Sequence, residues 1–476
     1  MTTTQPDSVV LSSSLVDEKM DDLISDLQIL IRHPSVSAIN EGLEECALVL
    51  SNMMNKAGIK TELLYLEKPS SIKNYQVSAL TVAPLVYGEV KSKSNPNGKT
   101  ILFYNHYDVQ PVDPIDKWDE NPFSGKVEGE MVFGRGSSDD KGEIITRLKA
   151  VEFFLKKTGD VPCNIKFLIE GEEEIGSPNL DKYLLRYADK FKCDLVFWES
   201  GYIDDKGRAI ISLGQKGILS VELKANGPLR DVHSSLAVAI ENPAWVLVHA
   251  LSLLYDNNDG KILIDGWFDD VQLPSEGELK QIEKEFFDGD SFKKEYGINT
   301  FVNDPSGFEL KKSLATAPTC NISGLFSGYA NEGVKTIIPS SATAKLDFRL
   351  VPNMNQKSQF NKLVSYIRSK GYHEDQLEVS YKSGVSGYRT SLNSEYVNLV
   401  VDAAKKVFSD IILNISSPGT GPMYSFKNLL NVDSICIGST VLLNKMHSPN
   451  EFTNIDLLNK ATKCFIEIIT KMAQNK

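Results

Sequence analysis

Histidine and acidic side chains follow directly after several short apolar runs of the sequence. The run TILFYN at residues 100–105, for example, ends against His106, with Asp108 two positions further on. Comparable side chains recur along the chain, and the candidate groups are His106 and Asp108, Asp139 and Asp140, Glu172, Glu173 and Glu174, Glu199, and His447. Ligands of open α/β sheets bind beyond the carboxyl ends of the strands. These five segments are therefore expected to deliver their side chains to one rim of a sheet.

Each segment also has an ordinary structural interpretation. His106 with Asp108 fits a surface pair, Asp139 or Asp140 fits a helix N-cap, and the glutamate run fits a solvated helix start. Several carboxylates that share one cleft, however, repel each other and lose hydration, at a cost on the order of several kcal/mol each. Divalent cations remove that objection, because two histidines and at least three carboxylates suit a pair of metal ions about 3.5 to 4 Å apart.

Such a pair of ions predicts hydrolytic chemistry. Two cations polarise a carbonyl and lower the pKa of a shared water from about 15.7 toward about 7, which makes hydroxide available at neutral pH. A free carboxylate must then take the proton, and in GEEE one glutamate can point to metal and its neighbour to water. Asp108 is placed to accept the second ring N–H of His106 and to fix its tautomer.

Composition limits the partners. The net charge of −12 argues against nucleic acid or an anionic membrane, because no basic face is available to neutralise phosphates. Small molecules or peptides are the expected ligands. No apolar stretch reaches the roughly 18 residues that span a bilayer. The start MTTTQPDSVVLSSS lacks the basic and apolar regions of a signal peptide, so we expect a cytoplasmic protein.

The elements that must position these residues form an α/β domain. The runs at 100–105, 163–169, 193–198 and 432–439 are short and apolar on both faces, as strands of a covered parallel sheet are, and a helix is predicted at 141–156 among them. A chain of 476 residues is too long for one ordinary core, so a second domain is expected.

That second domain has a different pattern. Residues 218–225 and 342–350 alternate between apolar and polar, which predicts sheets with one solvated face. Between them, Asn242 and Pro243 predict a helix start. We therefore expect an α+β domain inserted into the α/β domain. The predicted boundaries give residues 1–213 and 386–476 to the α/β domain and residues 214–385 to the insertion.

Nine short motifs give the chain a family resemblance. HYDVQP, GRGSSDDKGE, EGEEEIGS, WESG and MHSPNE stand in the order and spacing of the two-zinc aminoacyl amidohydrolase and dipeptidase family, and KWDENPF, DVHSS, ENPAW and FRLVPN also match it. This family includes carnosinase-type dipeptidases, glutamate carboxypeptidase, acetylornithine deacetylase and succinyl-diaminopimelate desuccinylase. The resemblance extends from about residue 16. It implies a zinc-peptidase-like catalytic domain with a mixed, mainly parallel sheet and an inserted lid and dimerisation domain.

The resemblance also implies roles for the candidate residues. The implied metal ligands are His106 and Glu199 for one ion, Glu174 and His447 for the other, and Asp139 as a bridge. Glu173 is the implied general base. Asp139 is preferred over Asp140 because the family keeps the first of these two positions acidic and varies the second. The ions are expected to be two Zn²⁺, although Mn²⁺ and Co²⁺ also suit these ligands.

Four further residues resemble the family's substrate and lid residues. His233 corresponds to a lid histidine that reaches the partner subunit's site in dimeric relatives and stabilises the oxyanion, so a homodimer is expected. Arg349 corresponds to the arginine that holds the substrate's carboxylate, although alternation alone makes it an ordinary arginine on a wet face. Gly419 and Thr420 lie in SSPGTGPMYSF, which resembles a glycine-rich substrate loop.

The choice of substrate rests on departures from the family pattern. Dipeptidases usually have Asp where this chain has Glu199, and carnosinase-like enzymes have an arginine where it has Ser417. The long insertion between residues 255 and 318 resembles the larger lid of the dipeptidases. We therefore predict a peptidase that cleaves dipeptides or a C-terminal residue, with an N-acyl amino acid deacylase as the alternative. A metal-binding protein without activity is disfavoured, because it would have no need of Glu173.

Overall fold

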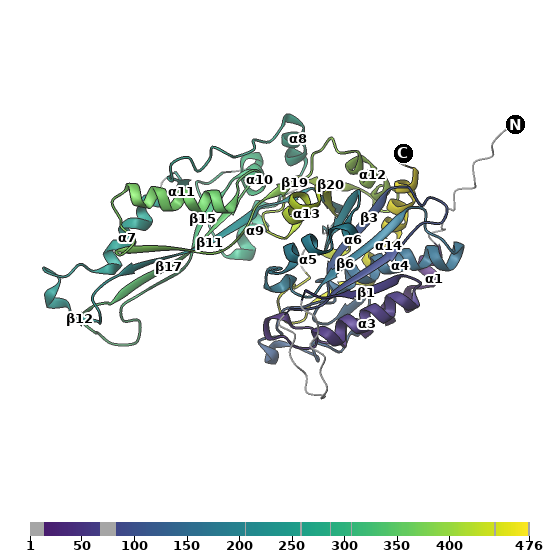
Figure 1. The fold of residues 1–476 in the computed structure, drawn as a ribbon, viewed down its shortest axis with the longest axis horizontal. Coiled ribbons are helices and arrows are strands. Elements are labelled where there is room, and N and C mark those ends of the chain that lie inside the picture. The colour runs from purple at the N-terminus through teal and green to yellow at the C-terminus, as the bar shows by residue number, and fades with distance from the viewer. Residues whose placement is uncertain are drawn as a thin grey trace. The chain divides into compact units, whose positions relative to one another are not determined.

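The computed structural model describes residues 14–66, 82–204, 206–257, 259–285, 287–305, 307–441 and 444–474. Contacts within the chain divide it into two compact units (Figure 1). Unit 1 comprises the chain up to Leu213, Thr390–Leu413 and Ser425–Lys476. Unit 2 comprises Gly214–Arg389 and the short segment Asn414–Tyr424. The assignment of the second unit as a lid and dimerisation domain stays a prediction.

Parallel strands form the centre of the sheet of unit 1. Strand β3 (Thr100–His106) lies between β6 (Asn164–Glu170) and β7 (Leu195–Trp198), β21 (Asp433–Cys436) follows β7, and these four strands run parallel to one another. All four residues of β7 are buried, and so are the last six of β3. Burial on both faces explains why β7 is apolar throughout and why β3 is apolar from Ile101 to Tyr104.

Flanking strands, joined mainly by antiparallel pairing, extend this sheet on both sides. Its order is β1-β2-β6-β3-β7-β21-β9-β8-β22, with β20 paired to β9. The flanking strands are β1 (Lys60–Leu64), β2 (Leu85–Val90), β8 (Tyr202–Ile203), β9 (Ala209–Ser212), β20 (Ile411–Asn414) and β22 (Thr440–Val441). A smaller sheet contains β4 (Lys126–Glu128), β5 (Met131–Phe133) and β23 (Phe452–Asn454). The predicted mixed α/β sheet is confirmed.

Two long helices cover the ligand-bearing strands. Helix α4 (Lys141–Thr158) packs against α14 (Ile455–Gln474), and Phe465 of α14 contacts the rings of Phe103 and Phe197 edge to face. The remaining helices of this part of the fold are α1 (Ser14–Glu18), α2 (Met20–Ile31), α3 (Leu43–Lys56), α5 (Leu180–Arg186), α6 (Ala188–Phe191), α12 (Glu395–Ala404) and α13 (Met423–Leu430). None of the helices in the described part of the chain has the length and hydropathy needed to cross a bilayer.

Unit 2 is built on an antiparallel sheet of order β15-β17-β11-β18. These strands are β11 (Gly217–Asn226), β15 (Thr319–Ser327), β17 (Ser341–Leu350) and β18 (Leu377–Val385). Burial alternates along β11 and β17, so the predicted α+β insertion with one solvated sheet face is confirmed. Its buried face packs against α7 (Pro243–Leu254) and α11 (Gln356–Ser369). The side chain of Asn242 caps α7 as predicted, by accepting the N–H of Ala244 at 2.9 Å.

The other elements of unit 2 are short. They are α8 (Glu276–Lys284), α9 (Gly289–Tyr296), α10 (Gly307–Thr316), β10 (Gly214–Gln215), β12 (Val232–His233), β13 (Tyr255–Asp256), β14 (Lys261–Ile262), β16 (Ile337–Ile338) and β19 (Tyr388–Arg389). The three helices fall in the charged insertion between residues 255 and 318.

Candidate active site

Three adjacent parallel strands deliver acidic and imidazole groups to one edge of the sheet of unit 1. His106 is the last residue of β3, and Glu199 directly follows β7. Strand β6 is followed by a short 3₁₀ turn, Glu173–Ile175, that carries two of the glutamates. Since the carboxyl ends of parallel strands meet at one edge, the order of the strands accounts for the meeting of residues far apart in the sequence.

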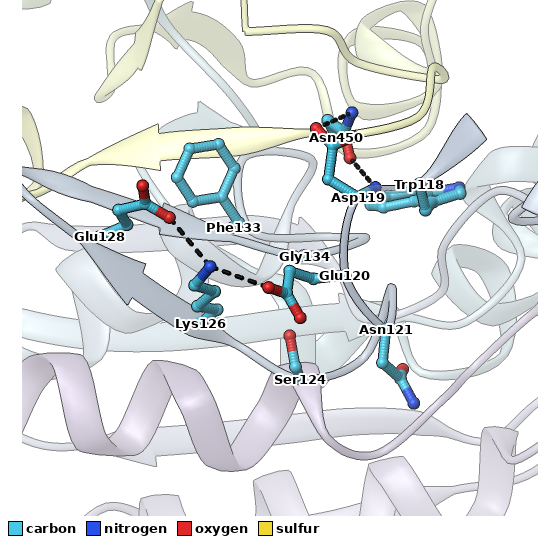
Figure 2. Close-up of a pocket in the computed structure, with 10 residues that line it drawn as sticks. All are labelled: Trp118, Asp119, Glu120, Asn121, Ser124, Lys126, Glu128, Phe133, Gly134 and Asn450. Atoms are coloured by element: carbon cyan, nitrogen blue, oxygen red, sulfur yellow. Dashed lines mark hydrogen bonds and ion pairs between the residues drawn. The ribbon is translucent and has the colours of Figure 1, made fainter. Parts of the chain in front are cut away.

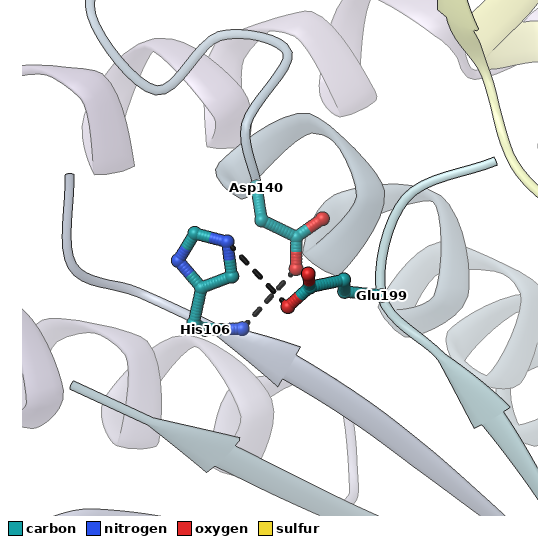
Figure 3. Close-up of side chains that lie close together, drawn as sticks. All are labelled: His106, Asp140 and Glu199. Carbon is teal, nitrogen blue, oxygen red and sulfur yellow. Dashed lines mark hydrogen bonds and ion pairs between the residues drawn. The ribbon is translucent and has the colours of Figure 1, made fainter. Parts of the chain in front are cut away.

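The first group consists of His106, Asp140 and Glu199, which converge in Figure 3. His106 Nε2 lies 3.7 Å from Glu199 Oε2, and the His106 backbone N–H donates to Asp140 Oδ2 at 3.1 Å. Asp140 stands at the N-cap of α4 but makes no capping bond with its side chain. Its Oδ1 and the Oε2 of Glu199 are buried and have no hydrogen-bond partner among the described residues.

The second group consists of Asp139, Glu174 and His447. His447 Nε2 lies 3.1 Å from Asp139 Oδ2 and 3.3 Å from Glu174 Oε2. The other oxygen of the same aspartate, Oδ1, lies 3.1 Å from Nε2 of His106. The Asp139 carboxylate therefore lies between the two groups, with one oxygen toward each histidine.

The buried acidic groups of this cluster would be stabilised by added positive charge. Burial raises the pKa of Glu199 well above its ordinary value, and the nearby Glu173 adds to the shift. Burial also raises the pKa of Asp140 to about 7. Hydrogen bonds to Asp139 and then to Glu174 raise the pKa of His447 to about 10. Without added cations, Asp140, Glu199 and His447 thus bind protons more tightly than a free carboxylate or imidazole does.

A pair of divalent cations fits this donor set. Two imidazoles and several carboxylates are suitable ligands for borderline divalent ions. Cations would also compensate the acidic groups and give partners to the buried oxygens of Asp140 and Glu199, which find none in the described part of the chain. The fold and this cluster therefore define a hydrolase of the dinuclear metal-dependent class.

Asp108 holds the turn that carries the glutamates. Its Oδ1 accepts the backbone N–H of Glu173 at 3.2 Å and its Oδ2 accepts that of Glu174 at 3.0 Å. For the Nδ1 of His106, the Asp108 backbone oxygen is closer, at 3.0 Å, than its carboxylate Oδ1, at 3.4 Å. The fully buried Asp108 thus orients both the first histidine and the glutamate turn.

Burial shifts the proton affinity of Glu173. It raises the pKa of this carboxyl to about 8, and the neighbouring Asp139 and Glu174 carboxylates act in the same direction. Glu173 does not belong to either of the two ligand groups. It is therefore a carboxyl group beside the cluster whose protonated form is favoured by its burial.

Glu451 is a site residue that the sequence did not point out. Its fully buried carboxylate accepts hydrogen bonds from Arg135 Nη1 at 2.7 Å and from the backbone N–H groups of Gly136, Ser138 and Asp139 at 3.0 to 3.1 Å. It thereby fixes the loop that presents Asp139. The only sequence signal is its place at the end of MHSPNE, four positions after His447.

A separate hollow of about 210 Å³ lies on unit 1 (Figure 2). Its lining includes Trp118, Glu120, Lys126, Glu128 and Asn450. Lys126 lies 2.9 Å from both Glu120 and Glu128, so the lysine of this lining is already paired with two of its carboxylates. None of the clustered histidines and acids lines this hollow, and we assign no chemistry to it.

The remaining predicted residues belong to unit 2 and are not part of the metal cluster. Arg349 Nη1 donates to Thr420 Oγ1 at 2.6 Å. The N–H of Gly419 bonds to Ser417 Oγ at 3.2 Å in the same loop. His233 is exposed, and its Nδ1 lies 2.8 Å from Ser235 Oγ. Arg349 and the loop that holds Ser417, Gly419 and Thr420 are thus brought together within this unit, and His233 is exposed.

Comparison with known proteins identifies the family. The model of "Peptidase family M20/M25/M40" matches residues 102–471, which is most of the chain. The chain belongs to this family, so the predicted resemblance is confirmed. It is a dinuclear metallopeptidase of the dipeptidase and carboxypeptidase type that hydrolyses small peptides.

Individual relatives share nearly the whole fold. An M20 family metallo-carboxypeptidase of Sulfolobus solfataricus, Sso-CP2, is 37% identical in sequence, with a TM-score of 0.85 over 95% of this chain and 100% of that one. The Cys-Gly metallodipeptidase dug1 of Schizosaccharomyces pombe is 27% identical over 96% of this chain and 97% of its own length. The human Beta-Ala-His dipeptidase is 28% identical over 83% and 79%.

Proposed function

We propose that two divalent cations, in the cell Zn²⁺, are held by His106 with Glu199 and by Glu174 with His447, and that Asp139 is shared. The observation that carries this proposal is the position of the Asp139 carboxylate, whose two oxygens each lie 3.1 Å from the Nε2 of a different histidine. Mn²⁺ and Co²⁺ suit the same donors. Measuring the metal content of the purified protein would therefore identify which ion it binds.

When bound, the two cations would polarise the scissile carbonyl and acidify a water molecule. Glu173 then accepts the proton of the attacking water and passes it to the leaving amine. Asp108 keeps the backbone of Glu173 and Glu174 in place. One glutamate can then act as the general base while its neighbour binds metal.

The proposed substrates are dipeptides, or short peptides that lose their C-terminal residue. Relatives that cover most of this chain are named for Cys-Gly, for Beta-Ala-His and for carboxypeptidase activity. All of these substrates carry a free carboxylate. We assign its recognition to Arg349, with Thr420 and Gly419, because an arginine beside a hydroxyl and a loop N–H is suited to that group.

A substrate panel tests this function. The chelated protein is reloaded with Zn²⁺, Mn²⁺ or Co²⁺ and offered Cys-Gly, Beta-Ala-His, a tripeptide and the same tripeptide with an amidated C-terminus. We expect cleavage of the peptides with a free carboxylate and a large loss on amidation. Inactivity on every dipeptide and on the free tripeptide would reject the proposal.

A deacylase is the second candidate, because Glu199 stands where dipeptidases usually have Asp. N-acetyl and N-succinyl amino acids in the same panel test it. A higher kcat/KM on these amides than on any peptide would favour the deacylase.

We also propose a homodimer formed through unit 2. Strand β15 pairs with β17 alone among the described strands, and it exposes Ile322, Leu325 and Phe326. Helix α7 exposes Trp245 (64%) and Val248. An apolar sheet edge is a liability for a monomer and a natural place for a second copy to pair. Sedimentation should give a dimer for the wild-type chain and a monomer for Phe326→Glu, and a monomeric wild-type chain would refute this assembly.

A further inference from the structure

Arg147 is a fully buried arginine on helix α4 with an unusual set of partners. Its Nη1 donates to the backbone oxygen of Tyr104 at 2.7 Å and to Asn105 Oδ1 at 2.8 Å. Its Nη2 donates to the backbone oxygens of Trp198 at 3.1 Å and Glu199 at 2.7 Å. One guanidinium thus bonds to the carboxyl ends of two neighbouring strands.

These bonds lie where the two strands cease to pair. The ladder between β3 and β7 runs from Ile101 opposite Leu195 to Phe103 opposite Phe197. The carbonyls that Arg147 binds come one or two residues later. His106 follows two residues after Tyr104, and Glu199 is itself one of the residues held. Arg147 therefore continues the connection between the strands up to the point where each presents a side chain to the cluster.

The surroundings of the guanidinium keep this connection rigid. The Arg147 guanidinium carbon lies 5.2 Å from the ring centre of Phe465 and 5.9 Å from that of Phe103. Buried hydrogen bonds from a charged donor are stronger than neutral ones, and the planar fork of an arginine fixes the directions of its N–H groups. A lysine has one ammonium in place of the two separate NH₂ groups that bond to the two strand ends here, and it lacks the fixed planar geometry of the guanidinium.

We propose that Arg147 is a positioning residue that sets the distance between His106 and Glu199, and thereby the affinity of the metal position formed by these two side chains. This inference rests on the proposed function, which assigns both residues to one cation. Arg147 touches neither the cation nor the substrate. Its effect is confined to the metal position formed by His106 and Glu199. None of the four hydrogen bonds of Arg147 involves Glu174 or His447.

The test compares Arg147→Met with a matched control on the same helix, Lys149→Met. Lys149 is also buried, and it lies 2.5 Å from Asp26 and 2.7 Å from Glu152, neither of which is in the cluster. Each chelated protein is titrated with Co²⁺ while its visible spectrum and bound cobalt are recorded. Loss of a ligand-orienting partner typically weakens metal binding by about 10- to 100-fold.

The wild-type chain and Lys149→Met are expected to bind two Co²⁺ ions. Arg147→Met is expected to bind one with wild-type affinity and the other about 10- to 100-fold more weakly. Its one-cobalt spectrum should match that of His106→Ala and differ from that of His447→Ala. If Arg147→Met does not fold, Arg147→Lys, which keeps the charge but lacks the planar guanidinium fork, carries the same expectation.

Two results would overturn the inference alone. They are a substituted Arg147 that leaves both affinities unchanged, and an equal loss at both positions, which would indicate general loosening of the fold. A wild-type chain that binds fewer than two Co²⁺ ions would instead overturn the proposed function, and this inference with it.

Discussion

Glu451→Gln is expected to disturb the loop that presents Asp139, with a magnitude that follows from the partners of Glu451. One carboxylate oxygen accepts from Arg135 and Gly136, and the other accepts from Ser138 and Asp139. Glutamine turns an NH₂ group toward two donors in either orientation, and it removes the countercharge of a buried arginine. Breaking a buried ion pair on one side costs about 3 to 5 kcal/mol.

Urea unfolding of the chelated protein measures this loss, and cobalt titration measures its effect on the site. Because Asp139 lies between both histidines, both cobalt affinities should fall, by about 10- to 100-fold, whereas Arg147→Met should weaken only one. The control is Glu120→Gln, which breaks a half-exposed pair with Lys126 at the hollow in Figure 2 and should change neither measurement. The reasoning fails if Glu451→Gln behaves like this control within about 0.5 kcal/mol.

Three further outcomes are expected. Glu173→Gln should lower kcat by about 10²- to 10⁴-fold with two metals still bound. Glu174→Ala should lose metal as well as activity. Equal metal loss in both variants would contradict the assignment of Glu173 as general base and Glu174 as metal ligand. Random dimers of Glu173→Gln and His233→Ala chains should recover about a quarter of wild-type activity, since each mixed dimer has one complete site, and no recovery would mean that His233 does not act across the dimer. Burial raises the pKa of Glu285 to about 7 from 4.5, so the folded chain keeps this proton between these values and loses stability as pH rises through them. Glu285→Gln should therefore stabilise unit 2 by up to about 3 kcal/mol at pH 8 and by much less at pH 5, unlike the exposed neighbour Glu283→Gln.

The central strands and the side chains at their ends were predictable from the sequence. A strand covered on both faces must be apolar, so the change from Tyr104 to His106 and from Trp198 to Glu199 marks where each strand reaches the edge of the sheet. The rule that such edges bind ligands then brings these residues together without any knowledge of the loops. From its residues alone, the pair of Asp139 and Asp140 fitted a helix cap. The family resemblance implied a bridging Asp139, and the structure shows Asp139 between the two histidines while Asp140 accepts a backbone N–H.

The residues that hold the ligands in place left no comparable pattern. Helix α4 buries Lys141, Glu143, Arg147, Lys149 and Glu152, so it lacks the apolar stripe by which a buried face is found. From the sequence, Arg147 is therefore expected to be exposed to solvent. The structure shows instead that it bonds to the ends of two strands. Glu451 bonds to a loop more than 300 positions earlier in the chain. Local spacing reveals residues that act at the edge of a sheet, but the groups that fix their geometry depend on contacts between distant segments. Substitutions at Arg147 and Glu451 thus test the part of the site that only the structure identifies.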